Sequence, residues 1–285
     1  MRSEQEMFRL ILDSAVNDPR VLAVGMNGSR ANKKAPKDLF QDYDIVYIVE
    51  SVESFLCDPS WIDQFGARLI MQTPEAMELF PPTNNGRFTY LMLFEDGNRI
   101  DLTLCPKEQA DYWHEGDRLA KVLLDKEQLL PDQAEATDQE YWINRPSQAE
   151  FSDCCNEFWW VSTYVVKGLW RNELFYAADH LNEHCQKELL RLLSWRAGAD
   201  NGYDFSVGKN YKYLPNYLTN EEYVVLLKTM DVSSIAAGWS ALLSLQKQFD
   251  YYAQQFSEKN NLVYDQKTAE KVIGYSTAFY FKSSK

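Results

Sequence analysis

Short apolar runs separated by polar turns fill the first half of the chain, and this pattern predicts a mixed α/β domain. Ser3 and Glu6 form a capping box ahead of apolar residues at helical spacing, which predicts a first helix ending near Asp18. Asp96-Gly97 predicts a hairpin between the last two strands, so these strands should be antiparallel. Runs rich in β-branched and aromatic residues predict the strands themselves, at 21–26, 43–49, 68–71, 89–94 and 99–104.

The second half has a helical pattern, which follows an acidic, polar stretch at 130–148 that suits a connection between domains. Capping boxes predict helices that begin after Ser147 and after Thr219. Between them, Asn172 is expected to cap a helix that Gly198 ends. The second half should therefore be a bundle of helices.

The chain of 285 residues has the length expected for two domains. A last apolar run at 235–256 predicts one more helix for the bundle. We therefore expect an α+β protein, with a mixed β-sheet domain and flanking helices over residues 1–135 and a helical bundle over residues 147–285.

Composition indicates a globular protein, because 45% of the residues are hydrophobic and 14% are aromatic. The apolar runs are too short to span a membrane, and the N-terminus lacks the apolar block of a signal peptide, so we expect a cytoplasmic protein. The 5 cysteines form no zinc-binding spacing, and we expect most of them to be reduced and buried.

The charge is strongly acidic, with 29 Lys+Arg against 42 Asp+Glu and a formal net charge of −13. Such a chain repels a polyphosphate backbone and cannot supply the counterion release that drives nucleic-acid binding. An acidic surface raises the local concentration of small cations, and this effect weakens with salt. The charge therefore favours a small cationic ligand over a nucleic acid.

Three aspartates in the predicted strands are the candidates for chemistry. Side chains alternate faces along a strand, so Asp42 and Asp44 should project the same way while Tyr43 and Ile45 enter the core. The same alternation places Asp101 on one face of its own strand. If the two strands are neighbours, three carboxylates converge.

Clustered carboxylates repel one another unless cations neutralise them, and hard oxygen ligands select Mg²⁺. Two such ions about 3.5–4 Å apart can hold the attacking and leaving oxygens of a phosphoryl displacement. Upstream, Gly28 lets the backbone approach phosphates, and Ser29 can bind them through its hydroxyl and N–H. The pattern predicts a metal-dependent enzyme acting on a nucleoside triphosphate.

The order Gly28-Ser29, Asp42-x-Asp44 and a distal Asp101 resembles the signature of the nucleotidyltransferase superfamily. Further segments resemble one branch of it, the bacterial aminoglycoside 6-adenylyltransferases, which modify streptomycin. The likeness covers nearly the whole chain and is carried by NGSRAN (27–32), KDLFQDYDIVY (37–47), RIDLTL (99–104) and DHLNEHCQKELLRLLSWRAG (179–198).

The resemblance implies transfer of AMP from ATP to the 6-hydroxyl of streptomycin, with release of pyrophosphate and with antibiotic resistance as the outcome. It implies a nucleotidyltransferase domain followed by a helical substrate-binding domain. We expect a monomer or weak dimer. The expected partners are ATP and a cationic aminoglycoside, without nucleic acid or membrane. Mg²⁺ would be held by Asp42, Asp44 and Asp101, and the nucleotide by Gly28, Ser29 and Arg30.

A general base is still needed, and we expect Asp179 to remove the proton of the acceptor hydroxyl or to bind a guanidinium of streptomycin. The alternative for Asp179 is a solvent-facing helix carboxylate. Lys167, Lys209 and Lys212 are further candidates for contacts to the triphosphate, although most lysines are solvated surface residues.

Three other functions stay open at this stage. His180, Glu183 and His184 match H-x-x-E-H, a zinc-peptidase pattern, but a pattern this short arises easily by chance. A regulatory module could keep the fold and bind ATP without turnover. A nucleotidyltransferase could instead modify a protein or another small acceptor.

Overall fold

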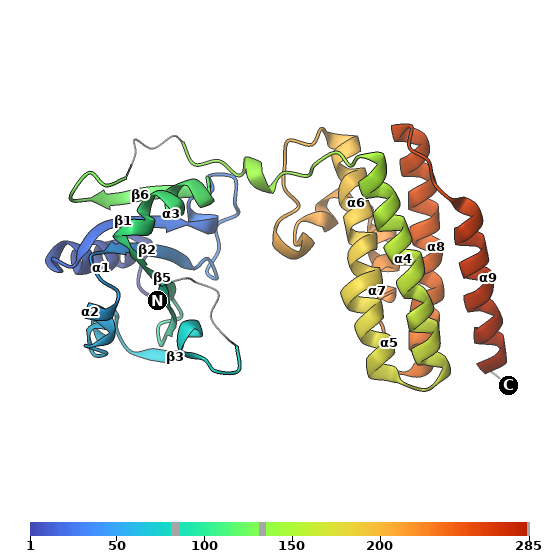
Figure 1. The fold of residues 1–285 in the computed structure, drawn as a ribbon, viewed down its shortest axis with the longest axis horizontal. Coiled ribbons are helices and arrows are strands. Elements are labelled where there is room, and N and C mark those ends of the chain that lie inside the picture. Colours follow the sequence, from blue (N-terminus) through green and yellow to red (C-terminus); the bar gives the residue numbers. More distant parts are fainter. Residues whose placement is uncertain (81–85, 131–134, 284–285) are drawn as a thin grey trace. The chain divides into compact units, whose positions relative to one another are not determined.

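The computed structural model describes residues 1–80, 86–130 and 135–283. The chain divides into two compact units, Met1–Glu140 and Tyr141–Lys285. The first unit is the blue-to-green part of the ribbon and holds the β-sheet, whereas the second is helical (Figure 1). The protein is therefore α+β, as the sequence pattern predicts.

The first unit is built on a 6-stranded sheet with the order β3-β4-β5-β2-β1-β6. The central pair β2–β5 is parallel and the other neighbours are antiparallel. The strands have the bounds Val21–Asn27 (β1), Tyr43–Val49 (β2), Arg68–Gln72 (β3), Phe88–Phe94 (β4), Arg99–Pro106 (β5) and Ala120–Asp125 (β6). The predicted hairpin at Asp96-Gly97 is confirmed, with Gly97 at φ +84°.

Helices cover both faces of this sheet. On one face, α1 (Glu4–Asn17) begins at the predicted capping box of Ser3 and buries Met7 and Ile11 against the strands. On the other face, α3 (Ala110–Gly116) packs Trp113 onto Gly25 of β1, where an added Cβ would lie 2.0 Å from the indole ring. The short helix α2 (Glu53–Leu56) follows β2.

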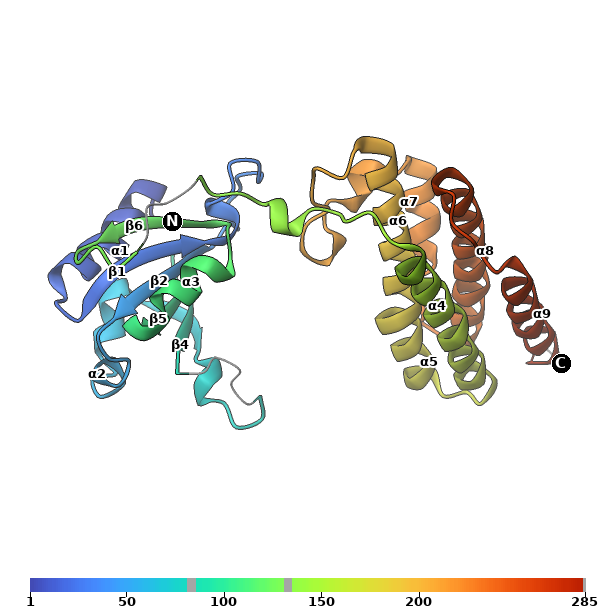
Figure 2. The same cartoon turned by 45° about the horizontal axis from the view of Figure 1, so that its top comes forward.

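The second unit is a bundle in which α4, α6 and α8 run side by side (Figures 1 and 2). The helix α5 continues into α6 through a π-helical segment at Leu181–Cys185. The helices have the bounds Gln148–Trp170 (α4), Leu174–His180 (α5), Gln186–Asn201 (α6), Asn220–Lys228 (α7), Ile235–Asn260 (α8) and Gln266–Ser283 (α9).

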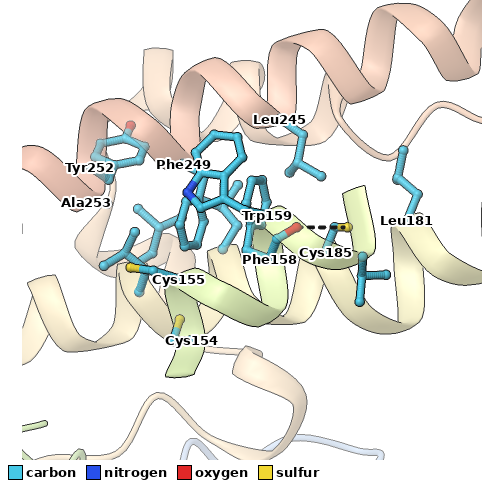
Figure 3. Close-up of a cluster of buried hydrophobic side chains, with 14 of the residues drawn as sticks. Cys154, Cys155, Phe158, Trp159, Leu181, Cys185, Leu245, Phe249, Tyr252 and Ala253 are labelled. Carbon is cyan, nitrogen blue, oxygen red and sulfur yellow. Dashed lines mark hydrogen bonds between the residues drawn. The ribbon is translucent and has the colours of Figure 1, made fainter. Parts of the chain in front are cut away.

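Aliphatic, aromatic and sulfur-containing side chains together form the core of the bundle (Figure 3). The ring of Phe158 on α4 stacks on that of Phe249 on α8, with centroids 3.7 Å apart and planes 5° from parallel. Cys185 donates a hydrogen bond from Sγ to the carbonyl of Phe158 at 3.9 Å. Four of the five cysteines are buried and none is in a disulfide, as predicted, whereas Cys57 is exposed.

The prediction for the helix between Asn172 and Gly198 is wrong at both ends. Asn172 adopts φ +58° and lies before the helix, whose N-cap is Glu173. Gly198 lies inside α6, and a glycine is required there because the ring of Tyr203 lies 2.5 Å from where a Cβ would be. The left-handed residue that ends α6 is Gly202, at φ +102°.

Several elements have no counterpart in the sequence-based prediction, namely β6, α2, α3 and α9. Residues 131–134 of the predicted connection lie outside the described residues. Among the residues that are described, no helix is long and apolar enough to cross a membrane.

Candidate active site

The turn that follows β1 requires glycine for two reasons. Gly28 adopts φ +73°, a left-handed conformation that L side chains rarely take. A Cβ at this position would also lie 2.1 Å from Oδ2 of Asp44. The backbone of the Gly28–Arg30 turn therefore lies directly against the carboxylate of Asp44.

The three predicted aspartates converge beside this turn. Asp44 on β2 pairs in register with Asp101 on β5, because the two strands are parallel neighbours in the sheet. Asp42 precedes β2 by one residue and lies on the same face as Asp44, while Tyr43 and Ile45 are 1% exposed in the core. One carboxylate oxygen from each aspartate lies within 4.8 Å of the other two.

This donor set fits a hard divalent cation. All three aspartates are partly buried and offer only oxygen ligands, as Mg²⁺ requires. The backbone at Gly28 comes close to the carboxylate of Asp44 because no side chain separates them. Among the side chains that the structure describes, this is the single group of three His, Cys, Asp or Glu residues able to hold a metal ion.

Two arginines contact the segments that carry the aspartates. Arg30 donates hydrogen bonds to the carbonyls of Asp42 at 2.9 Å and Gln41 at 2.8 Å, and its guanidinium lies 3.8 Å from the ring centroid of Tyr43. These contacts fix the chain just before β2. Arg30 therefore positions Asp42, whatever further contact it makes to a nucleotide.

Arg99 has no role in our interpretation of the sequence, although strand alternation puts it on the same face as Asp101. It donates from Nε and Nη2 to the two oxygens of Asp101 at 2.8 and 2.7 Å, and Nε lies 4.0 Å from Oδ2 of Asp42. The hydrogen bond to Asp101 is the main cause that raises the pKa of Arg99.

Asp179 lies on α5 in the second unit, with a side chain that is 64% exposed and 3.9 Å from Nδ1 of His180. Aromatic rings lie next to it: the ring centroid of His180 is 4.2 Å from that of Tyr176 and 5.4 Å from that of Tyr164. Nζ of Lys167 is 4.7 Å from the ring centroid of Tyr164 and 4.9 Å from that of Tyr176. One aromatic surface of the bundle thus holds Lys167 and borders Asp179.

The other two candidate lysines are exposed residues of the segment after α6. Lys209 begins a short 3-10 turn, and Lys212 follows that turn with Nζ 5.0 Å from the ring centroid of Tyr213. Both belong to the helical unit, whereas the three aspartates belong to the first unit.

The zinc-peptidase pattern does not form a metal site among the described residues. His180 directs Nδ1 to the carbonyl of Tyr176 at 2.9 Å, and Glu183 pairs with Lys187 at 2.8 Å. His184 lies 3.6 Å from Glu157. His180 thus contacts its own helix α5, whereas His184 lies in the π-helical segment Leu181–Cys185 and contacts α4.

A mixed sheet that brings a Gly-Ser turn against three clustered carboxylates defines the nucleotidyltransferase class. The comparison with known families supports this assignment, because the family model of streptomycin adenylyltransferase matches residues 1–279. The chain belongs to this adenylyltransferase family and is an enzyme, which argues against a regulatory module without turnover.

Relatives that match over most of their length carry the name aminoglycoside 6-adenylyltransferase. The protein of Bacillus subtilis (strain 168) is 50% identical, over 90% of this chain and 91% of its own. That of Campylobacter jejuni is 42% identical, over 96% of each chain, and that of Staphylococcus aureus is 40% identical, over 93% and 94%. A crystal structure of an aminoglycoside 6-adenyltransferase from Bacillus subtilis is 44% identical, covers 98% of this chain and 99% of its own, and gives a TM-score of 0.49.

Proposed function

We propose that this protein transfers AMP from ATP to a hydroxyl of an aminoglycoside, with the 6-hydroxyl of streptomycin as the expected acceptor. The observation that carries the proposal is the convergence of Asp42, Asp44 and Asp101 beside Gly28. The name shared by the three relatives supplies the acceptor class.

On the nucleotide side, Asp42, Asp44 and Asp101 would hold Mg²⁺, which would neutralise the charge that develops on the reacting phosphate. The backbone and hydroxyl of Ser29, which follows Gly28 in the turn after β1, would bind the outer phosphates. The hydroxyl of Ser29 has no partner among the described residues, so it is available for this contact. Lys167, Lys209 and Lys212 stay candidates for the triphosphate.

In the transfer itself, the acceptor oxygen forms a bond to the α-phosphorus of ATP. The bond from that phosphorus to the bridging oxygen breaks, and pyrophosphate leaves with the electron pair. The hydroxyl proton goes to a carboxylate, and we assign this role to Asp179 because it is an exposed base beside an aromatic surface. Atoms and charge balance without any further reactant.

On the acceptor side, recognition would rest on charge and on ring stacking. Streptomycin is a polycation with guanidinium groups, and this chain has a formal net charge of −13. Carboxylates bind guanidinium groups through paired hydrogen bonds, and aromatic rings stack on them. A cytoplasmic enzyme of this kind would inactivate the antibiotic before it reaches its target and so confer resistance.

The experiment that tests the function is direct. The protein is incubated with labelled ATP, Mg²⁺ and a panel of aminoglycosides, and products are identified by mass. We expect streptomycin plus one AMP, with an equal amount of pyrophosphate. Label found on a protein, or on another small molecule alone, would replace the acceptor we propose.

Variants separate the site from non-specific effects. Asp44→Asn and Asp101→Asn should abolish transfer while circular dichroism shows an intact fold, because each removes a metal ligand. The matched control is Asp13→Asn, which changes an exposed carboxylate on α1 of the same unit and should leave the rate unchanged. Full activity of Asp44→Asn would remove the metal site from the proposal.

A further inference from the structure

The aspartate cluster gathers three negative charges beside one arginine, Arg99. Three carboxylates with oxygens within 4.8 Å of one another would repel strongly and destabilise the fold. Arg99 supplies a positive charge at this point that no change of pH in the working range can remove, since a guanidinium stays protonated. It therefore offsets part of the repulsion permanently.

The geometry of Arg99 is that of a bound counter-ion. It lies two residues before Asp101 on β5, so both side chains leave the same face of the strand. Both oxygens of Asp101 accept hydrogen bonds from it, and its Nε also approaches Asp42. The side chain of Arg99 is 47% exposed, whereas that of Asp101 is 17% exposed, so the arginine has room to move into solvent and the aspartate does not.

We infer that Arg99 is the internal counter-ion of the metal site, which stabilises the metal-free protein and competes with the metal for Asp101. A divalent cation held by Asp42, Asp44 and Asp101 would lie close to the guanidinium, and like charges at such a distance repel. Full coordination of a divalent ion by Asp101 would therefore require Arg99 to lose at least part of its paired contact with this carboxylate.

This competition sets two properties against each other. Arg99 raises the stability of the metal-free protein and, by the same interaction, lowers the affinity for metal. The inference rests on the metal site of the proposed function, but it concerns the affinity and not the transfer of AMP. Arg99 is a positioning residue, because it acts through Asp101.

The test measures metal affinity and stability in the whole protein. Binding of Mn²⁺ alone is followed by electron paramagnetic resonance, and the Tm is measured in chelator and in Mg²⁺. For Arg99→Gln we expect a lower Tm in chelator, Mn²⁺ binding that is tighter by roughly threefold to tenfold, and a larger rise of Tm with Mg²⁺. Arg99→Lys keeps the charge but not the paired hydrogen bonds, so its Tm and its Mn²⁺ affinity should lie between those of the wild-type protein and Arg99→Gln.

The control is Arg191→Gln in the helical unit. Arg191 also makes a paired contact to a carboxylate, Glu188, with side chains 48% and 12% exposed, which nearly matches the Arg99–Asp101 pair. This change should lower the Tm equally in chelator and in Mg²⁺ and leave Mn²⁺ affinity unchanged. If Arg99→Gln does not fold, Arg99→Lys carries the test against the same control.

Two outcomes would overturn the inference. Weaker Mn²⁺ binding in Arg99→Gln would mean that Arg99 orders Asp101 for the metal, and unchanged binding would mean that the pair is an ordinary surface contact. Neither measurement uses ATP or an aminoglycoside. If Arg99→Gln binds Mn²⁺ more tightly but the wild-type protein transfers no AMP, the proposed function is rejected and the role of Arg99 is kept. If the wild-type protein transfers AMP but Arg99→Gln binds Mn²⁺ with unchanged affinity, the role of Arg99 is rejected and the proposed function is kept.

Discussion

Gly28 is required for two reasons, its backbone conformation and its closeness to the carboxylate of Asp44. Its positive φ alone would disfavour other residues, and the carboxylate of Asp44 occupies the space where a side chain would begin. A substitution here would force the carboxylate of Asp44 to move, because its Oδ2 and Cγ lie 2.1 and 3.0 Å from the position of the added Cβ.

We expect Gly28→Ala to lower the free energy of unfolding by about 1–3 kcal/mol, the usual cost of strained backbone. It should also weaken Mn²⁺ binding and reduce AMP transfer, because Asp44 has to move. Urea unfolding and metal titration measure the two effects. The control Gly274→Ala changes an open position in α9, where nothing lies within 4 Å of the added methyl group, and should be neutral or slightly stabilising. Metal affinity equal to wild type in Gly28→Ala would contradict the close packing described here.

Asp179→Asn should lower kcat by about 10²–10⁴-fold if this carboxylate accepts the proton, because general bases typically contribute that much. The fold should be unaffected, since the side chain is 64% exposed. Steady-state kinetics with streptomycin give the answer, with Asp153→Asn on an exposed part of α4 as the control. A raised KM with unchanged kcat would reassign Asp179 to acceptor binding, and no change in either would exclude both roles.

Among the elements, α7 carries a carboxylate that contacts two other helices of the bundle. Glu222 completes the capping box with Thr219, pairs with Arg196 of α6 and accepts a hydrogen bond from Tyr252 of α8 at 3.2 Å. The hydrogen bond from Arg196 is the main cause that lowers the pKa of Glu222 to about 2, from an ordinary value of 4.5. One ionised side chain thus links three helices.

The stabilisation from Glu222 should therefore depend on pH. A carboxyl whose pKa is lower in the folded protein stabilises it above the unfolded pKa, and this contribution disappears as the pH falls from about 5 to about 2. We expect Glu222→Gln to lose about 1–2 kcal/mol at pH 7 and progressively less below pH 5. Urea unfolding at several pH values, with exposed Glu221→Gln as the control, measures it. A difference that stays constant with pH would contradict the role of the charge.

How well each element could be predicted from sequence follows from how local its determinants are. The capping boxes of Ser3, Ser147 and Thr219 involve bonds between residues three apart, and all three helix starts are as predicted. The strand β6 pairs only with β1 at the edge of the sheet, and α9 buries little beyond Ala269 and Ser276, so neither has a strong periodic signal. The prediction that Gly198 ends a helix is wrong because a sequence does not distinguish a glycine that ends a helix from one that lies under a packed ring.

The local features of the candidate site could also be predicted from the sequence, whereas its long-range contacts could not. Alternation along a strand is local, and it correctly grouped Asp42 with Asp44 and put Asp101 on one face. The contact between the two groups depends on β2 and β5 being neighbours, which no short segment encodes. The ion pair of Arg99 with Asp101 also needs side-chain conformations that only the structure supplies.

At the scale of the whole molecule, net charge is the property with the clearest consequence for an acceptor. A formal charge of −13 attracts a polycation over a distance set by screening, which is about 30 Å at 0.01 M salt and about 8 Å at 0.15 M. ATP carries the opposite charge and should not benefit. The two substrates should therefore respond differently to ionic strength.

We expect the KM for streptomycin to rise several-fold between 0.01 and 0.15 M salt, because long-range attraction is lost. The KM for ATP, measured at saturating acceptor and constant free Mg²⁺, should fall or stay level over the same range. The comparison within one protein serves as its own control. Equal changes in both constants would show that salt acts on the enzyme generally and not on capture of the cation.

The parallel pairing of β2 with β5 also bears on how the protein reaches its native state. Asp101 lies in a hairpin, β4–β5, whose two strands are close in sequence and can associate early. Asp44 joins it only after the intervening chain, with β3 and β4, has closed as a long loop, and contacts of such large sequence separation form slowly. The carboxylate cluster is not assembled until β2 pairs with β5, so the capacity to bind a divalent ion should arise only after this pairing has formed.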